Sequence, residues 1–232
     1  MGPDTVSVVL PAYNEEGNIE TAITEAQAVL STSVSDYEVI VVNDCSLDRT
    51  GEVAATCARR DGHVRVITNP RNLGLGGSMR AGFEASRGAL VFYTDSDLPI
   101  DMRDLLPAVP LMARHDLVAG YRLNRDEGPR RALYSWAYNR LVRWCFHLPV
   151  RDVNFSFKLI KRSVLESIDL SSTGSFIDAE LLAAAVAAGF SVGEIGVQYR
   201  PRTWGTSTLA SPRVIRGILI ELAAYMRRSI RP

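Results

Sequence analysis

The feature that most constrains this chain is a repeated alternation of short apolar runs and helical stretches before Asp97. The apolar runs are 6–10, 37–42, 64–68 and 89–93, and each is rich in β-branched or aromatic residues. Continuous apolar runs of this length are typical of strands buried on both faces. Strands that alternate with helices form parallel sheets with right-handed crossovers. We therefore predict an α/β fold with a mostly parallel central sheet flanked by helices.

The predicted helices between these strands span 18–30, a stretch ending near Arg60, and a stretch ending at Ser86. Ser46 or Asp48 can cap the second of them. The third follows a glycine-rich loop at 72–77, whose spacing does not match a dinucleotide-binding fingerprint. Its glycines either let the backbone approach a phosphate or permit tight packing beside the ligand.

Beyond Asp97 the pattern is less regular but still alternates. We expect helices at 101–112, 133–146, 176–188 and 211–230, and strands at 117–121, 153–160 and 191–199. The 232 residues suffice for one well-packed core, so we predict a single domain with an amphipathic helix at its C-terminal end. Packing on its own domain is the usual role of such a helix, and contact with a membrane or a partner subunit is the alternative.

Composition excludes some partners and compartments. The 26 acidic and 26 basic residues balance, so no overall field attracts nucleic acid. The three cysteines are scattered without a CxxC pair, as expected of reduced thiols in the cytoplasm. We see no signal-peptide pattern and no apolar run of roughly 20 residues. The sequence thus predicts a cytoplasmic protein. If it acts at a membrane, it either lies on the cytoplasmic face or lacks its anchor in this sequence.

Two carboxylates, Asp95 and Asp97, directly follow the fourth predicted strand. Such a pair can bind one divalent cation, Mg2+ or Mn2+, which prefers oxygen ligands and shares them with phosphates. The alternative is a turn whose carboxylates cap the next helix. Because ligands bind beyond the carboxyl ends of strands in open α/β sheets, the position favours the metal.

Polar residues also follow the first two strands. Asp44 can accept hydrogen bonds from a uracil or guanine edge, Tyr13 can stack on a base, and Glu15 can bind ribose or base. Each has a plainer alternative, which is an Asx-turn or helix cap for Asp44, a loop anchor for Tyr13 and a solvated residue for Glu15. All three strand ends should border one crevice.

Basic residues gather in the predicted loops of the second half, and arginine binds phosphate with a rigid fork. We expect three or four of them in the site and the others at the surface. The set is Arg122, Arg125, Arg130, Arg131, Arg151, Lys158, Arg200 and Arg202.

Four motifs occur in an informative order: VVLPAYNEE at 8–16, VVNDCSLDRT at 41–50, NLG at 72–74 and TDSD at 94–97. Together they resemble family 2 glycosyltransferases with the GT-A fold. The segments GYR at 120–122, RDVNFSFK at 151–158, DAEL at 178–181 and RTWGTS at 202–207 are similar to the polyprenyl-phosphate sugar synthases, including dolichyl-phosphate mannose and glucose synthases. This resemblance extends over nearly the whole chain.

The resemblance implies a role for each half of the domain. Residues 1–122 would bind the nucleotide-sugar, of the GDP-mannose or UDP-glucose class, and residues 123–210 the acceptor, with 211–232 as the terminal helix. It implies nucleotide-binding roles for Pro11, Tyr13, Glu15, Asp44 and Asp95, and metal binding by Asp95 and Asp97. The implied acceptor-phosphate ligands are Arg131, Lys158, Arg202 and Ser207, and the implied catalytic residues are Asp97, Asp178, Arg122 and Arg131.

The implied reaction is inversion by direct displacement, with the metal and basic side chains stabilising the leaving diphosphate. A phosphate acceptor is already anionic, whereas an alcohol would need a general base. Asp178 is the best candidate base, followed by Glu180, although both suit a helix N-terminus without any catalytic role.

This sequence departs from the synthase pattern at two positions. Pro99 stands where a glutamine often supplies a further metal ligand, and Thr208 replaces a lysine of the later motif. A transferase for a small-molecule acceptor is therefore one alternative to a polyprenyl-phosphate transferase. A non-catalytic binder of sugar nucleotides is another.

Overall fold

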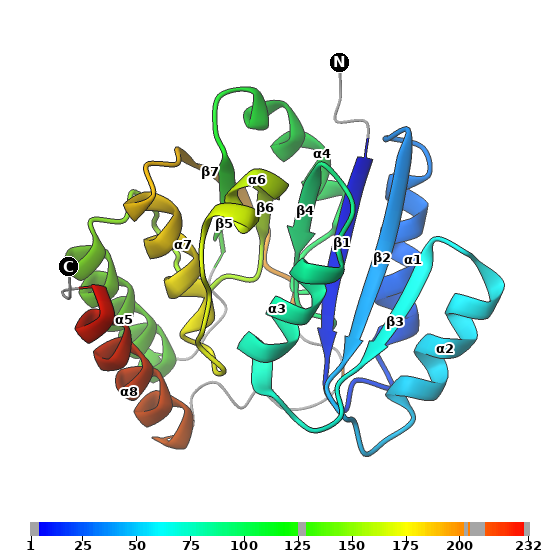
Figure 1. Ribbon diagram of the computed structural model, residues 1–232, viewed down its shortest axis with the longest axis horizontal. Helices are drawn as coiled ribbons and strands as arrows, with labels where there is room; N and C mark the ends of the chain where they lie inside the picture. Colours follow the sequence, from blue (N-terminus) through cyan, green and yellow to red (C-terminus); the bar gives the residue numbers. More distant parts are fainter. Residues whose placement is uncertain (1–4, 125–128, 202–203, 205–211, 230–232) are drawn as a thin grey trace.

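A seven-stranded mixed sheet forms the centre of the protein (Figure 1). The computed structural model describes residues 5–124, 129–201, 204 and 212–229. The strand order is β3-β2-β1-β4-β6-β5-β7, and only β6 runs antiparallel to its neighbours. The strands are β1 Thr5–Ala12, β2 Asp36–Asn43, β3 Val64–Thr68, β4 Leu90–Tyr93, β5 Leu117–Arg122, β6 Lys158–Lys161 and β7 Val192–Val197.

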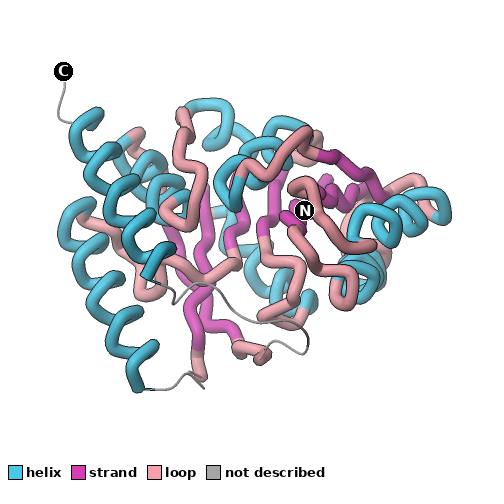
Figure 2. The backbone as a smooth tube through the Cα atoms, turned by 90° about the horizontal axis from the view of Figure 1, so that it is seen from below, coloured by secondary structure: helices cyan, strands magenta, loops and turns pink. Residues whose placement is uncertain are grey.

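The strands are apolar on both faces because both faces are covered by helices (Figure 2). Along β1, Val8 and Leu10 belong to one core and Val9 to the other, which is the two-residue alternation of a strand. One core contains α1 Ile19–Leu30, α2 Thr50–Arg60 and the short helices η1 Met102–Asp104, α4 Leu105–Ala108 and η2 Val109–Ala113. The other contains α3 Gly74–Ala85, α5 Pro129–Phe146, α6 Arg162–Ser167, α7 Ile177–Ala187 and α8 Pro212–Ser229.

The predicted α/β class and the first four parallel strands are confirmed. Several predicted boundaries were wrong, and α5 begins at Pro129 rather than at 133. The glycine-rich segment is mostly helical, since α3 begins at Gly74. The helix predicted at 101–112 is broken into short helices around Pro107 and Pro110, and the strand predicted at 153–160 begins only at Lys158. Proline lacks the amide donor that a continuous helix needs. The sequence analysis also missed the six-residue helix α6.

The glycines at the start of α3 serve tight packing. A Cβ on Gly76 would lie 2.1 Å from the carbonyl oxygen of Ser172, and one on Gly74 would lie 2.4 Å from that of Thr173. Gly74 also has φ of 73°, which disfavours other residues. Of the two roles considered for this segment, close packing against the loop before α7 is the one that the contacts support.

We expect Gly76→Ala to destabilise the fold by about 1–3 kcal/mol, the usual cost of overpacking. The backbone carbonyl of Ser172 cannot move away as a flexible side chain can. Gly62→Ala is the matched control, because a Cβ at Gly62 has no atom within 4 Å. Urea unfolding of both variants tests this, and equal stability of the two would contradict the packing argument.

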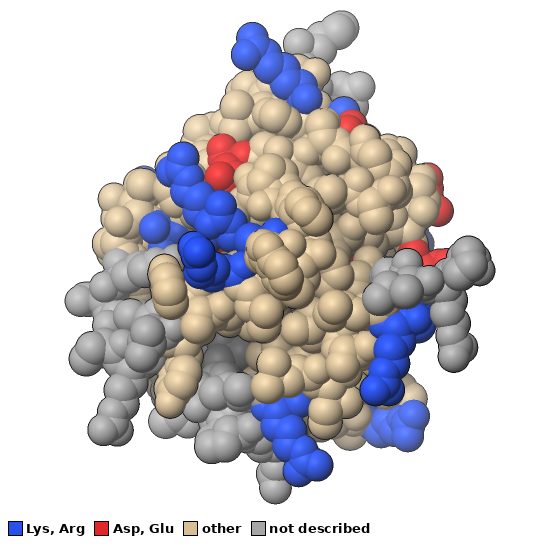
Figure 3. All heavy atoms as spheres, turned by 90° about the vertical axis from the view of Figure 1, so that its left-hand side faces the viewer, with Lys and Arg blue, Asp and Glu red and all other residues tan. Residues whose placement is uncertain are grey.

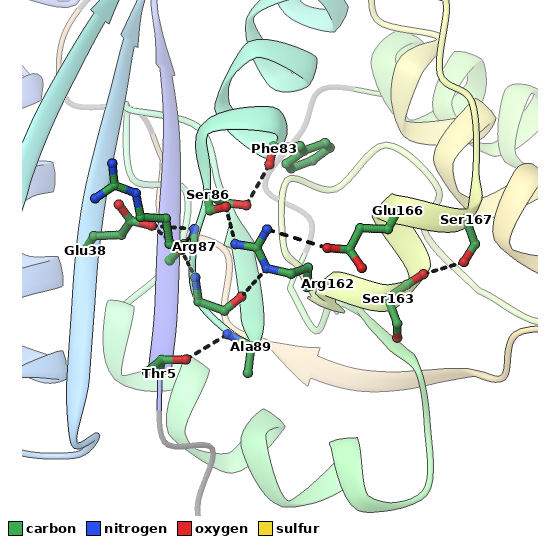
Figure 4. Close-up of polar contacts among 12 residues, drawn as sticks. Thr5, Glu38, Phe83, Ser86, Arg87, Ala89, Arg162, Ser163, Glu166 and Ser167 are labelled. Carbon is green, nitrogen blue, oxygen red and sulfur yellow. Dashed lines mark hydrogen bonds and ion pairs between the residues drawn. The ribbon is translucent and has the colours of Figure 1, made fainter.

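The sheet edge that carries the amino end of β1 is fixed by polar contacts (Figure 4). The amides of Arg87 and Gly88 donate to Ser7 Oγ over 3.1 and 2.8 Å, and the Ala89 amide donates to Thr5 Oγ1 over 2.8 Å. From the start of α6, the Arg162 guanidinium donates to the carbonyl oxygens of Ser86 and Gly88. These bonds set the start of β4 against β1 and β6, and so fix where β4 ends at the opposite edge.

The C-terminal helix α8 packs on its own domain, as its apolar stripe suggests. Ile218 and Leu222 are buried, and the ring of Tyr225 contacts Phe146 of α5 at 5.4 Å and Phe176 at 5.9 Å. Its one acid, Glu221, accepts hydrogen bonds from the amides of Thr173 and Gly174. Over the part of the chain described, no helix combines the length and apolar character needed to span a bilayer.

Candidate active site

The loops after β1 and β2 are joined to each other by reciprocal hydrogen bonds. Asn14 donates its amide to Ser46 Oγ, and its side-chain oxygen accepts from the Leu47 amide at 2.8 Å. The Glu16 amide likewise donates to Asp48 Oδ2 over 3.1 Å. The motifs at 8–16 and 41–50, far apart in sequence, therefore form one wall at the carboxyl edge of the sheet.

The loop after β4 joins the same wall. Ser96 lies between the two aspartates of the TDSD motif, and its hydroxyl donates to the Pro11 carbonyl over 2.6 Å. Ser96 is buried, so this bond is shielded from water. It holds Asp95 and Asp97 beside the end of β1, and the three strand ends border one site as expected.

The environment of Asp95 is crowded with acids. Burial first, and then the neighbouring charges of Asp97 and Asp178, raise the pKa of Asp95 to about 7. Hydrogen bonds from Ser156 and from the buried hydroxyl of Tyr93, at 3.0 Å, act in the opposite direction. Burial and mutual repulsion make this group of carboxylates unfavourable, unless a bound cation neutralises their charge.

The donor set fits a hard divalent cation, because Asp95 and Asp97 offer carboxylate oxygens. Among the described residues, no group of three or more His, Cys, Asp or Glu converges to complete a shell. Pro99 offers no side-chain ligand, and its carbonyl accepts from the Arg200 amide at 2.8 Å. Two protein ligands would leave the remaining positions to donor phosphates and water, a pattern usual for Mg2+.

Asp44 is buried and extensively hydrogen-bonded. Its Oδ1 accepts from Asn69 Nδ2 at 2.7 Å and the Leu73 amide at 2.8 Å, and its Oδ2 accepts from the Gly74 amide at 2.9 Å. The carboxylate thus sits at the N-terminus of α3 and binds its first amides, where negative charge is favourable. Asp44 therefore acts as a helix cap, which was the alternative to nucleotide binding, and the helix it caps is α3. Its contact with the nucleotide stays a prediction.

Tyr13 and Glu15 lie on the loop after β1. Tyr13 is 44 % exposed, so its ring is available for stacking. Glu15 is half-buried, and its Oε2 accepts from Asn18 Nδ2 over 2.6 Å. Trp204, from the motif at 202–207, packs on Gly17 of the same loop, where a Cβ would meet the indole at 2.7 Å. The motif at 202–207 therefore contacts the loop that follows the motif at 8–16.

Lys158 and Asp178 form an ion pair inside the protein. Lys158 Nζ lies 3.1 Å from Asp178 Oδ1, and the two side chains are 0 % and 4 % exposed. Burial raises the pKa of Asp178, and the Lys158 ammonium opposes that shift. Sequence analysis expects Lys158 to bind the acceptor phosphate, but its contacts in the structure are Asp178 and the Phe155 carbonyl. The predicted phosphate and base roles of this pair receive no support from its geometry.

Arg122, predicted as catalytic, lies at the end of β5 and is held by Asp152. Its Nε lies 2.7 Å from Asp152 Oδ2 and its Nη2 lies 3.1 Å from Oδ1, a two-pronged pairing with both side chains almost wholly buried. The guanidinium also lies over the rings of Phe155 and Tyr199, at 5.5 and 5.8 Å. The motifs at 120–122 and 151–158 thus meet in space.

Several partners of the site were missed by sequence analysis. Tyr93 bonds to Asp95, Asp152 holds Arg122, and Asn139 of α5 accepts the Val153 amide at 2.7 Å. Asp152 lies within the motif at 151–158, which was the available signal for it. Tyr93 resembled any core residue of a strand.

Two of the other basic residues have partners of their own. Arg200 pairs with Glu25 at 3.3 Å and also with Asp101, while Arg151 stacks on the ring of Tyr121 at 4.4 Å. The remaining predicted residues are outside the described side chains, and they are Arg125, Arg130, Arg131, Arg202, Ser207 and Thr208.

Comparison with known families identifies the family of this chain. Residues 7–169 match the model of the family named Glycosyl transferase family 2. The chain belongs to this family. Its members in the comparison include glycosyltransferase AglD of Haloferax volcanii, 35 % identical over 98 % of this chain and 38 % of that protein. The dodecaprenyl-phosphate galacturonate synthase of Rhizobium johnstonii is 30 % identical over 98 % of this chain and 69 % of that protein. This family 2 chain therefore spans well under half of one relative and about two thirds of the other.

Solved structures show the GT-A fold for this family 2 chain. Glucosyl-3-phosphoglycerate synthase of Mycobacterium tuberculosis, in complex with Mn2+, UDP and glucosyl-3-phosphoglycerate, superposes with a TM-score of 0.74 at 21 % identity. The match covers 95 % of this chain and 79 % of that one. At this identity the likeness establishes architecture alone, and the expected GT-A fold is confirmed.

Proposed function

We propose that this chain transfers a hexose from a nucleoside-diphosphate sugar to a polyprenyl phosphate, with inversion at the anomeric carbon. The observation that carries the proposal is the position of Asp95 and Asp97, held beside the end of β1 by the Ser96–Pro11 hydrogen bond. Relatives named dodecaprenyl-phosphate galacturonate synthase and undecaprenyl-phosphate 4-deoxy-4-formamido-L-arabinose transferase support the acceptor class.

The donor would bind across the wall formed by the loops after β1 and β2. Tyr13 would stack on the base, Glu15 would contact the ribose, and Pro11 would line the pocket. Residues 1–122 thus serve the donor and 123–210 the acceptor. Asp95 and Asp97 would hold Mg2+ or Mn2+, which when bound neutralises charge on the departing diphosphate.

The state of Asp178 favours a phosphate acceptor. An alcohol requires a base to remove its proton, whereas a phosphate monoester, with a second pKa of about 6, is already ionised near neutral pH. Asp178, the acid that would serve as base, is buried and ion-paired with Lys158. Direct attack by a phosphate oxygen needs no such residue. Arg131, Arg202 and Ser207 remain our candidates to bind the acceptor phosphate.

The test is a donor panel followed by an acceptor comparison. Thermal shifts with UDP-, GDP- and dTDP-sugars in the presence of Mn2+ identify the donor, which we expect to stabilise the protein only when metal is present. Transfer is then measured to a polyprenyl phosphate in detergent, with the corresponding polyprenol as the matched control. We expect product from the phosphate alone. Transfer to small alcohols but not to the phosphate would identify the alternative acceptor class, and donor binding without any transfer or hydrolysis would indicate a binding protein.

A further inference from the structure

Tyr93 is the one residue of strand β4 that has a polar group on its side chain. The other three are leucine, valine and phenylalanine, and all four are buried. Tyr93 has no exposed surface, and its ring meets that of Phe83 from α3 edge-on at 6.4 Å. A buried tyrosine hydroxyl usually finds a hydrogen-bond partner, because leaving it unpaired costs free energy. The partner here is Asp95, whose Oδ1 accepts from the Tyr93 hydroxyl over 3.0 Å.

The backbone explains why these two side chains meet. Successive side chains of a strand alternate between its two faces, and Val91 and Tyr93 both belong to the core that contains α3. Asp95 follows Tyr93 by two residues, so it leaves the sheet on the same side. The turn itself is fixed by the bond from Ser96 to the Pro11 carbonyl. Asp95 is therefore held twice, once through its backbone and once through its carboxylate.

The donors to Asp95 are neutral, whereas a neighbouring acid has a cation. The hydroxyls of Tyr93 and Ser156 both bond to the Asp95 carboxylate. Asp178 instead pairs with the Lys158 ammonium at 3.1 Å. Lys158 stands directly opposite Tyr93 in the ladder between β4 and β6, so a positive charge is close at hand and is used for Asp178. The described contacts of Asp95 thus orient its carboxylate without cancelling its charge.

The acids of α7 are satisfied inside the protein, which sets them apart from Asp95. Asp178 and Glu180 are both buried, and Glu180 accepts the amides of Ser171 and Ser172. Figure 3 looks onto the side of the molecule that carries α5 and α8, and few acidic side chains are visible on the described part of that surface. The acids of α7 therefore serve the interior, and Asp95, at the end of β4, is the member of this group whose charge is left for a cation from solution.

We propose that Tyr93 is a positioning residue for the divalent metal, whose hydroxyl fixes the Asp95 carboxylate before the metal binds. A carboxylate has about four lone-pair directions, and the two hydroxyls restrict which of them stay open. The rotation that a loose aspartate would lose on binding is already lost here. This inference deepens the proposed function, since it rests on the metal site at Asp95 and Asp97, but it depends on neither the sugar nor the acceptor.

The test is Tyr93→Phe, which keeps the ring in the core and removes only the hydroxyl. Binding of Mn2+ alone is measured without any donor, from the electron paramagnetic resonance signal of the free ion. We expect Mn2+ to bind on the order of tenfold to a hundredfold more weakly, the usual effect of losing a hydrogen bond to a metal ligand. In transfer assays the KM for Mn2+ should rise by a similar factor. The rate at saturating Mn2+ should stay close to that of the unaltered protein.

Two variants separate this role from simple packing. Tyr37→Phe removes the same hydroxyl group near the start of β2, opposite Val6 and at the other end of the sheet, and should leave Mn2+ binding unchanged. Phe83→Leu removes the ring that packs on Tyr93 but keeps the Tyr93 hydroxyl. It should lower stability in urea and leave Mn2+ affinity close to that of the unaltered protein. Equal weakening of Mn2+ binding in Phe83→Leu and Tyr93→Phe would show that Tyr93 only packs, and would overturn the inference.

The Mn2+ measurement also separates this inference from the proposed function, because it needs no substrate. If Tyr93→Phe weakens Mn2+ binding while no acceptor receives sugar, the role of Tyr93 stands and the proposed function is wrong. If transfer to polyprenyl phosphate persists and Tyr93→Phe depends on Mn2+ as the unaltered protein does, the function stands and the role of Tyr93 is wrong. Failure of the unaltered protein to bind Mn2+ would also overturn the inference.

Discussion

Asp97→Asn should lower sugar transfer on the order of a thousandfold, since charge stabilisation by a metal contributes several kcal/mol at a departing phosphate. The substitution keeps the shape of the side chain and removes its charge. Because Asp97 raises the pKa of Asp95, the variant should also relieve repulsion in the metal-free protein. We therefore expect a protein that is at least as stable without metal and that gains less stability from Mn2+ and donor together.

The matched control for this prediction is Asp36→Asn, an exposed carboxylate that starts β2 at the end opposite the candidate site and accepts the amide of Tyr37. Its transfer rate should equal that of the unaltered protein. Rates are compared over a titration of Mn2+, so that weaker metal binding is distinguished from loss of chemistry. Turnover by Asp97→Asn that matches the control at every metal concentration would refute the metal assignment.

Lys158→Met should destabilise the fold by about 3–5 kcal/mol, the usual cost of leaving one member of a buried ion pair without its partner. The Lys158 side chain has no exposed surface, and in the variant the Asp178 carboxylate would stay buried without the lysine ammonium. The double variant Lys158→Met with Asp178→Asn removes both charges and should recover most of the loss. Urea unfolding of the two single variants and the double variant measures the coupling between the residues.

The exposed pair of Arg49 and Glu52, with side chains 71 % and 65 % exposed, supplies the control. Arg49→Gln should leave stability almost unchanged, because water screens such pairs. One other outcome would support the acceptor-phosphate role that sequence analysis predicts for Lys158. If Lys158→Met kept full stability and raised the KM for polyprenyl phosphate alone, Lys158 would be an acceptor ligand.

The first half of the fold was predictable because each strand carries its own signal. The runs at 6–10, 37–42, 64–68 and 89–93 are apolar on both faces, and helices must cover both faces of such a sheet. The site edge followed from topology, because parallel strands end on the same side. The position of β6 did not follow, since four residues that run antiparallel between β4 and β5 have no distinct pattern of their own.

The contacts of individual site residues were less predictable than their location. A sequence shows that Asp44 follows a strand, but not that α3 begins close enough for Leu73 and Gly74 to donate to it. It shows a basic motif at 151–158, but not that Lys158 turns inward to Asp178. Such pairings depend on which helix packs across the strand ends. Local periodicity carries no information about that choice.

The Asp44 carboxylate also limits how this scaffold can be re-engineered. The Asp44 side chain, directly after β2, binds the first turn of α3. The glycines of that turn pack on the loop before α7, which α8 in turn holds through Glu221. Libraries that randomise Asp44 to alter donor preference would remove the contact that holds α3, and with it the packing of α3 on the loop before α7. We expect most clones from such libraries to be unstable. Diversity placed at Tyr13, which is exposed, offers a route to new donors that leaves these contacts of Asp44 intact.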